Sequence, residues 1–279
     1  MSLQPFSLQL AGQVASGLRR PGPGPRVLAL HGWLDNAASF VPLLDHLPGL
    51  DMVMLDLPGH GFSSHLPRAA SYTTPAAICH VLDVADALGW ERFTLLGHSM
   101  GAGIASLTAS VSERVERLVA IEALGGLRGP ESETAQRLRE HIDASRRTAV
   151  RPLRVFPTLA APIRARMMAN QLSEANARLL VERGLQEVPG GYRWRTDQRL
   201  MLPTAIRLTE GQIDNLLQAI ACPVQVIYAT PAQSYYPEPL RSDRLAHLRH
   251  GQLAVLPGTH HVHMERPADI AGIILRFLG

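Results

Sequence analysis

The stretch Phe93-Thr94-Leu95-Leu96-Gly97-His98-Ser99-Met100-Gly101, continued by Ala102-Gly103-Ile104-Ala105-Ser106-Leu107, predicts a buried strand, a sharp turn and a helix of small residues. The glycines two positions on either side of Ser99 permit a strained strand-to-helix turn. Such a turn lifts the serine hydroxyl clear of the sheet and places it at a helix N-terminus, where backbone N–H groups favour developing negative charge. The pattern therefore predicts a nucleophile elbow, and an ordinary glycine-rich turn is the alternative reading.

Short apolar runs alternate with helical stretches on both sides of this elbow. Runs of this kind are typical of strands that are buried on both faces of a parallel sheet. The helix after the second run has Thr74 as its expected cap and ends at Gly89, and residues 6–19 predict an N-terminal hairpin turning at Ala11-Gly12. We expect a mostly parallel central sheet with helices on both faces. The runs are Val27–Leu30, Met52–Leu55, Phe93–Leu96, Leu118–Ile121, Val224–Tyr228 and Leu253–Leu256.

The alternation of strand and helix stops between residues 127 and 215. This segment has a helical pattern interrupted by prolines and contains no strong strand signal, so we predict a helical cap inserted into a core formed by residues 1–126 and 216–279. Residues 128–207 hold 15 Arg against 8 acidic residues. Because Asp and Glu are mixed among these arginines, we interpret them as a solvated helical face and expect no nucleic-acid partner.

Composition sets the broad class of the protein. The 279 residues are 46% hydrophobic, with a mean hydropathy of +0.02, as in soluble globular proteins. We find neither a signal-peptide pattern nor an apolar run of the roughly 20 residues that a membrane span needs, so we expect a cytoplasmic protein. The two cysteines, Cys79 and Cys222, are expected to be separate buried thiols.

Three further motifs carry a resemblance to a known family. One follows the first run, one follows the second run, and one lies near the C-terminus. Together with the elbow they resemble the α/β-hydrolase fold family over nearly the whole chain, and more narrowly its serine hydrolase-like (kraken-type) branch. The motifs are His31-Gly32-Trp33-Leu34-Asp35-Asn36-Ala37, Asp56-Leu57-Pro58-Gly59-His60-Gly61-Phe62-Ser63 and Gly258-Thr259-His260-His261-Val262-His263-Met264-Glu265-Arg266-Pro267.

The resemblance implies a nucleophile and a base. Ser99 would be the nucleophile, because a serine hydroxyl becomes reactive when an adjacent imidazole takes its proton. In the family a Glu lies five residues after the catalytic histidine and a Pro two residues later, so Glu265 and Pro267 select His260 as the base. Asp56 is expected to hold its loop together.

The family pattern also implies groups around the substrate. The backbone N–H groups of Trp33 and Met100 would form the oxyanion hole. His31, Gly32 and His98 would lie in the loops around the substrate, where the histidines orient the backbone rather than transfer protons.

The triad acid departs from the commonest family pattern. The usual Asp would fall near Ala232, and that stretch has no carboxylate before Glu238. Glu122 follows a buried strand beside the elbow strand, and parallel strands end at the same edge of a sheet, so we favour Glu122 as the acid. Glu238 or Asp243 would be the next candidates. Alternatively, Glu122 pairs with an arginine of the cap segment and has only a structural role.

These features predict a serine hydrolase that cleaves an ester or a similar acyl bond without a cofactor. We expect a small ester-like substrate with an apolar acyl or alkyl group. His261 and His263 lack a matching acidic cluster, so no metal site is expected. A serine nucleophile disfavours haloalkane dehalogenase or epoxide hydrolase chemistry, which needs a carboxylate there. Carbon–carbon bond hydrolysis on the same triad, or a non-catalytic binding protein, remain the alternatives.

Overall fold

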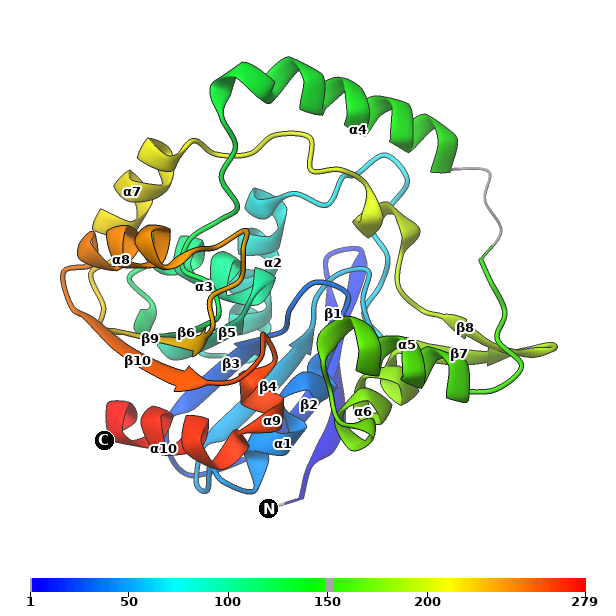
Figure 1. Ribbon diagram of the computed structural model, residues 1–279. Helices are drawn as coiled ribbons and strands as arrows, with labels where there is room; N and C mark the ends of the chain where they lie inside the picture. Colours follow the sequence, from blue (N-terminus) through cyan, green and yellow to red (C-terminus); the bar gives the residue numbers. More distant parts are fainter. Residues whose placement is uncertain (1, 149–152) are drawn as a thin grey trace.

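The central element is one eight-stranded sheet with the order β1-β2-β4-β3-β5-β6-β9-β10 (Figure 1). This computed structural model describes residues 2–148 and 153–279. Strand β2 pairs antiparallel with both β1 and β4, and all other strand pairs in the sheet are parallel. This arrangement confirms the predicted fold class. The strands are β1 (Gln4–Leu10), β2 (Gln13–Arg20), β3 (Arg26–Leu30), β4 (Asp51–Asp56), β5 (Phe93–His98), β6 (Val115–Ile121), β9 (Val224–Thr230) and β10 (Gly251–Pro257).

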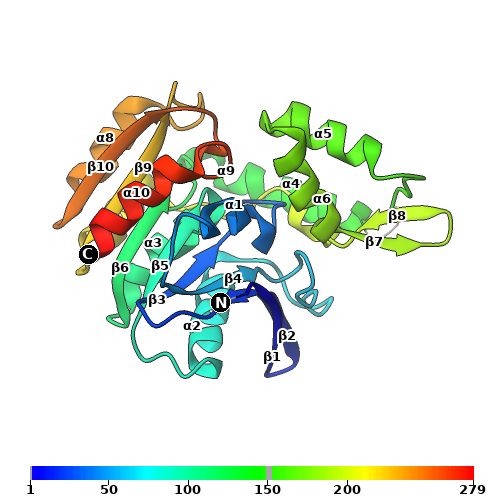
Figure 2. The same ribbon diagram turned by 90° about the horizontal axis from the view of Figure 1, so that it is seen from below.

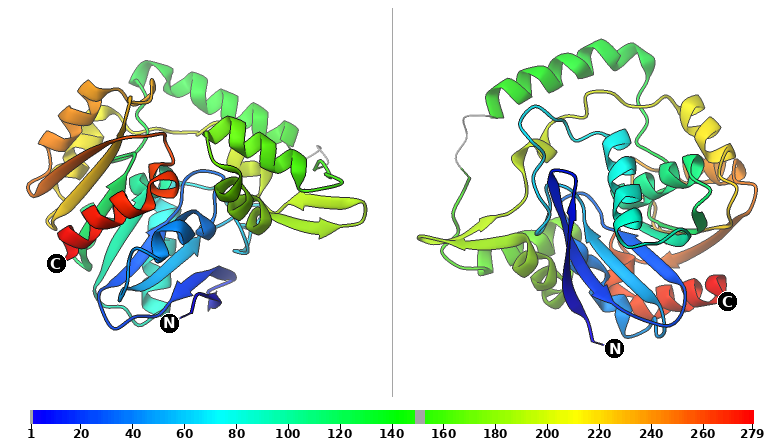
Figure 3. Two further views of the ribbon diagram at one scale, coloured as in Figure 1. Left: turned by 60° about the horizontal axis from the view of Figure 1, so that its bottom comes forward. Right: turned by 180° about the vertical axis from the view of Figure 1, so that it is seen from behind.

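Helices cover both faces of this sheet (Figures 2 and 3). Each face has its own cluster of buried apolar side chains, because the central strands point alternate residues to opposite sides. One face is covered by α2 (Thr74–Ala87), α3 (Met100–Val111), α7 (Glu210–Gln218) and α8 (Glu238–Ala246). The other face is covered by α1 (Val41–Leu44), α9 (Val262–Glu265) and α10 (Pro267–Leu278).

Three local details differ from the sequence predictions. The cap of α2 is Thr73 rather than Thr74, and its hydroxyl accepts a hydrogen bond from the backbone of Ala76. The strand β10 is not buried on both faces, because it lies at the edge of the sheet and leaves Val255 52% exposed. Cys79 is exposed on α2, so the prediction of a buried thiol was wrong there. Cys222 is half-buried.

The segment between β6 and α7 holds α4 (Thr134–Thr148), α5 (Ala160–Asn170), α6 (Glu174–Gly184) and two short strands, β7 (Leu185–Val188) and β8 (Gly191–Trp194). We expected no strands in this segment, and the two short strands show that this expectation was wrong. The two strands form a separate hairpin that does not join the central sheet, and Figure 3 shows it beside α5 and α6. Helix α7, by contrast, buries Ile213 and Leu217 in the main core, so the range 127–215 includes part of a core helix.

Ion pairs between buried groups join α5 and α6 to the loops at the carboxyl ends of the strands. Arg183 of α6 binds the fully buried Asp56 through two hydrogen bonds of 2.6 and 3.1 Å. Arg166 of α5 binds Asp35 at 3.1 Å. These contacts tie α5 and α6 to the residues that end β4 and follow β3. Within the described ranges, none of the helices combines the length and the apolar character that crossing a membrane requires.

Candidate active site

Ser99 occupies the sharp turn between β5 and α3. Its φ of 52° and ψ of −117° are strained for a residue with a side chain, as expected for the predicted elbow. A side chain at Gly97 would collide with the backbone of Ala102, and one at Gly101 would collide with the carbonyl of Leu30. The two glycines are thus required by the close approach of helix and strand.

The structure brings Ser99, His260 and Glu122 into one chain of hydrogen bonds. The Ser99 hydroxyl lies 2.8 Å from His260 Nε2, and His260 Nδ1 lies 3.0 Å from Glu122 Oε2. A carboxylate only accepts hydrogen bonds, so Nδ1 donates and Nε2 is left to accept the serine proton. The histidine side chain is 22% exposed, whereas that of Glu122 is fully buried. The imidazole can therefore meet a substrate while its carboxylate partner is shielded from water.

Glu122 lies just beyond β6, with a backbone φ of 62°. Its Oε1 accepts the backbone N–H of Ala229, and the guanidinium of Arg241 lies on the same side. This arginine belongs to α8, outside the cap segment that the sequence suggested as the source of a partner. Glu238 and Asp243 are exposed, and in the described ranges neither has a hydrogen bond or ion pair with His260.

The two N–H groups expected in the oxyanion hole are those of Met100 and Trp33, and within the described ranges neither donates to a backbone carbonyl. Met100 is the first residue of α3, so its N–H has no partner within the helix. Trp33 follows β3 on the neighbouring strand, and its 53% exposed side chain donates from Nε1 to the carbonyl of Leu200 at 2.9 Å. The indole thereby ties the segment after β3 to the cap.

The structure places His31 and His98 behind the site rather than at its surface. His31 accepts the N–H of Leu57 at 3.0 Å, and its other nitrogen donates to the carbonyl of Gly32 at 2.7 Å. His98 Nε2 donates to the carbonyl of His260 at 2.8 Å. Burial lowers the pKa of both imidazoles, and neighbouring histidines lower that of His98 further. Both therefore remain neutral, and their placement favours roles in holding the loops.

Gly32 is packed against this support. A side chain there would meet His98 Nδ1 at 2.9 Å and Asp35 Oδ2 at 3.1 Å. The close approach lets the segment after β3 pass directly over the elbow. A larger residue would push Trp33 away from the serine.

A buried cluster of Asp35, His98 and His261 lies beside this support. Its potential ligand atoms lie within 4.8 Å of one another, and it is the one such group within the described ranges. Burial raises the pKa of Asp35, but the hydrogen bond from His261 and the charge of Arg166 outweigh it, so the pKa is lowered. The carboxylate is thus already paired with a guanidinium, and the cluster works as an ion-pair network between the histidine loop and α5.

The remaining histidine-loop residues also have structural partners. His263 is fully buried and its Nε2 lies 2.7 Å from the hydroxyl of Ser39. Glu265 accepts hydrogen bonds from the backbone of Ser173 and the side chain of Asn176 at the start of α6. Sequence reasoning missed these partners, and it also missed Arg241. No spacing rule links them, because each contact joins segments that are distant in the chain.

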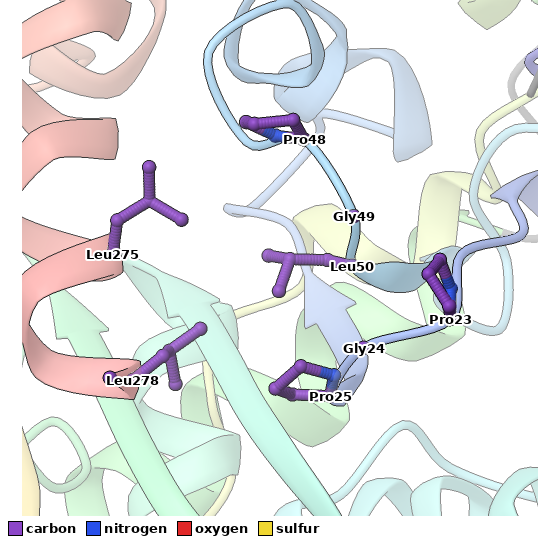
Figure 4. A pocket seen from close by; sticks show the side chains of 9 residues that line it. Pro23, Gly24, Pro25, Pro48, Gly49, Leu50, Leu275 and Leu278 are labelled. Carbon is purple, nitrogen blue, oxygen red and sulfur yellow. The ribbon is translucent and has the colours of Figure 1, made fainter.

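A separate pocket lies between α10 and the loops that precede β3 and β4 (Figure 4). It has a volume of about 360 Å³ and is apolar. Leu50 of its lining immediately precedes β4, whereas Ser99 follows β5, so the cavity and the serine are at opposite ends of the parallel strands. The lining residues are Pro23, Gly24, Pro25, Pro48, Gly49, Leu50, Leu275, Leu278 and Gly279.

A sequence model described as the alpha/beta hydrolase fold matches residues 25–230. The chain belongs to the alpha/beta hydrolase fold family. A serine hydrolase-like protein of Danio rerio is 30% identical to it over 302 residues, which cover 100% of this chain and 93% of the relative. The resemblance to the serine hydrolase-like branch is thereby confirmed.

Solved structures of this alpha/beta hydrolase's relatives have the same fold. A hypothetical protein of Pseudomonas aeruginosa PAO1 superposes with a TM-score of 0.92 at 38% identity, covering 98% of this chain and 99% of the other. The thioesterase domain from the curacin biosynthetic pathway gives a TM-score of 0.87 at 25% identity, covering 99% and 100%. The likeness to the thioesterase domain and to the serine hydrolase-like relative supports hydrolase activity.

Proposed function

We propose that this alpha/beta hydrolase is a serine hydrolase that cleaves a carboxylic ester or a similar acyl bond. The observation that carries the proposal is the hydrogen-bonded chain from Ser99 through His260 to Glu122 at a strained elbow. Each member has the partner that its role needs: a base on the hydroxyl, and a carboxylate on the far nitrogen of that base.

The reaction follows from this order of groups. The Ser99 oxygen attacks the substrate carbonyl while His260 Nε2 takes its proton, and Glu122 stabilises the imidazolium that forms. The N–H groups of Trp33 and Met100 would bind the oxyanion of the tetrahedral intermediate. His260 then gives the proton to the leaving alcohol or thiol, and an acyl-enzyme remains. Water, deprotonated by His260, attacks the acyl-enzyme, and His260 returns that proton to the Ser99 oxygen as the acid leaves; no cofactor takes part.

Exposed aromatic groups beside the nucleophile favour an apolar acyl or alkyl group in the substrate. The Tyr235 ring lies 6.3 Å from the His260 ring and is 58% exposed, and Trp33 is similarly exposed. Substrate that covers these rings gains binding free energy from the apolar area removed from water. We propose that the segment of residues 127–215 forms the cap over this site, with α7 packed on the core.

The alternatives make different demands on the same residues. The lack of an acid near Ala232 suggested a non-catalytic protein. The Glu122 carboxylate, 3.0 Å from His260, weakens that argument because it can serve as the acid. Carbon–carbon bond hydrolysis uses the same triad, so it is distinguished by substrate. A panel of p-nitrophenyl esters of rising acyl length, together with a diketone, separates these two reactions.

The test is labelling and turnover in matched serine variants. Wild-type protein should react with a fluorophosphonate probe and hydrolyse p-nitrophenyl esters, and Ser99→Ala should lose both while keeping its fold. Ser110→Ala is the control, because among the described residues the Ser110 hydroxyl on α3 bonds only to the carbonyl of Leu107. Undiminished turnover in Ser99→Ala would refute the proposal, and a folded wild-type protein that neither labels nor turns over would favour the non-catalytic alternative.

A further inference from the structure

A buried arginine lies behind the proposed triad acid. Arg241 of α8 is only 5% exposed, and the Glu122 carboxylate beside it is fully buried. Arginine is almost never buried unless it is paired, because removing its charge from water is costly. The position of this guanidinium therefore calls for an explanation.

Most of the guanidinium is held by groups other than Glu122. Its Nε donates to the carbonyl of Tyr236 at 3.0 Å, and Nη1 donates to the carbonyl of Ala229 at 2.7 Å. The guanidinium carbon lies 4.5 Å from the centre of the Tyr228 ring and 5.6 Å from that of Tyr236, within range of cation–π attraction. These contacts fix the plane of the guanidinium, and their two hydrogen bonds use only Nε and Nη1.

That remaining nitrogen faces the carboxylate. Arg241 Nη2 has no hydrogen-bond partner among the described residues and lies 3.5 Å from Glu122 Oε1. The other carboxylate oxygen, Oε2, binds His260. The cation thus sits on the oxygen that the histidine does not use, and it does not compete for the hydrogen bond to the imidazole.

One residue, Ala229, joins the two charges. The N–H of Ala229 donates to Glu122 Oε1, and the carbonyl of the same residue accepts from Arg241 Nη1. The anion and the cation therefore lie next to each other, and each is bound to the same residue of strand β9. This arrangement fixes the carboxylate in the plane where Oε2 points at His260.

We propose that Arg241 is a positioning residue that pairs with the charge of the buried Glu122 and holds its carboxylate turned toward His260. The inference rests on the proposed function, because it assigns a role through the triad. Physically, a carboxylate without water needs a nearby positive charge, and a general base can supply one only after it has taken a proton. Arg241 supplies that charge permanently, because an arginine side chain does not lose its proton.

A merely structural arginine would give different results. Arg244, one turn further along α8, provides the matched control because it is also buried and also lies over Tyr236, at 5.4 Å. It binds the carbonyl of Leu124 at 2.7 Å and the carboxylate of Glu210, and it has no contact with the triad among the described residues. Its loss should weaken the packing of α8 and leave the chemistry unchanged.

The experiment compares Arg241→Gln, Arg241→Lys and Arg244→Gln in the full chain. With p-nitrophenyl butyrate at equal folded fraction, Arg241→Gln should lower kcat about 10- to 100-fold, the range seen when an orienting partner is removed. KM should stay within about twofold, and the downfield proton resonance of His260 Nδ1–H should shift or vanish. Arg241→Lys keeps the charge and should recover part of kcat. Arg244→Gln should change neither kcat nor the resonance.

A double variant keeps the proposal testable if Arg241→Gln does not fold. Glu122→Gln/Arg241→Gln removes both buried charges, which is tolerated better than removing one. If Arg241 acts through Glu122, this double variant should have the same kcat as Glu122→Gln alone. A further tenfold loss in the double variant, or unchanged kcat and resonance in Arg241→Gln, would overturn the proposal. If wild-type protein proves inactive, the proposed function fails, and the resonance alone still tests the arrangement.

Discussion

Replacing Glu122 by Gln changes one oxygen to an amide nitrogen and leaves the shape of the side chain intact. In the structure Oε1 accepts the N–H of Ala229, so the oxygen of the glutamine stays there and the NH2 group faces His260 Nδ1. Two donors cannot share that contact, so Nδ1 must give up its proton and accept instead. The proton then resides on Nε2, which points at Ser99 and can no longer accept from it.

The expected magnitude follows from this tautomer. When the acid of such a triad is made neutral and the histidine adopts the wrong tautomer, kcat falls about 10⁴-fold. At 1.36 kcal/mol per factor of ten, this is about 5 kcal/mol of lost transition-state stabilisation. KM should change little, because Glu122 is buried and does not contact substrate. Arg241 also loses its paired charge, and breaking a buried ion pair costs about 3 kcal/mol of folding free energy.

The assay is ester hydrolysis at 20 °C on protein whose folded fraction is checked by circular dichroism. Glu238→Gln and Asp243→Asn are the matched controls, because both carboxylates are exposed on α8 and were the alternative acids. They should retain wild-type kcat. A kcat for Glu122→Gln within tenfold of the wild type, or an equal loss in either control, would show that the acid is not Glu122.

Two further predictions concern stability. Burial, and then the repulsion that a proton on each of His60 and His31 would cause, lower the pKa of His60 to about 3. Its neutral form therefore stabilises the fold fully above pH 6.5, and this contribution is lost as the pH falls toward 3, by about 2 kcal/mol at pH 5. Urea midpoints at pH 7 and pH 5 measure this loss, and equal midpoints would contradict it. Asp56→Asn should lower stability by about 3 kcal/mol, because it removes the charge that pairs with the half-buried Arg183. Thermal melts check this, whereas kcat of the folded variant should stay within a few-fold of wild type, since Asp56 holds a loop and touches no reacting group.

The sheet could be predicted because each central strand is a nearly continuous apolar run. Val27–Leu30 and Phe93–Leu96 have this pattern, and the structure places both at the centre of the sheet. The edge strand β10 has the same composition, so its apolar run did not reveal that one side of it is exposed. Burial of a strand depends on its neighbours in the sheet, which local sequence does not specify.

The β7–β8 hairpin was missed for a related reason. The prolines of this segment were interpreted as interruptions of a helical pattern, whereas Pro189 and Gly190 form the turn and Gly191 begins β8, with a φ of 89° at Gly190 and 135° at Gly191. The flanking strands have only four residues each, too few for a clear alternation. Their stability comes from packing with α5 and α6, in a cluster that includes Trp194.

The candidate site also contains some residues that the sequence specifies and others that it does not. Ser99 could be predicted because its position depends on a sharp local turn, and the two flanking glycines in the sequence indicate that turn. The position of Glu122 could be inferred only from where its strand ends. Arg241 could not be inferred, because an arginine on an amphipathic helix is normally solvated, and its burial depends on the rings of Tyr228 and Tyr236 from other segments.

The location of Glu122 after β6 has an evolutionary consequence. In the proposed triad, the nucleophile and the acid follow neighbouring strands, so the segment from Pro231 to Tyr235 carries no reacting group. Tyr235 nevertheless lies against His260 at the surface. Mutations in this segment can therefore reshape substrate preference without passing through an inactive ancestor. Residues 231–235 can therefore vary while the proposed triad stays unchanged. A library of sequences in this short segment can be screened for new substrates.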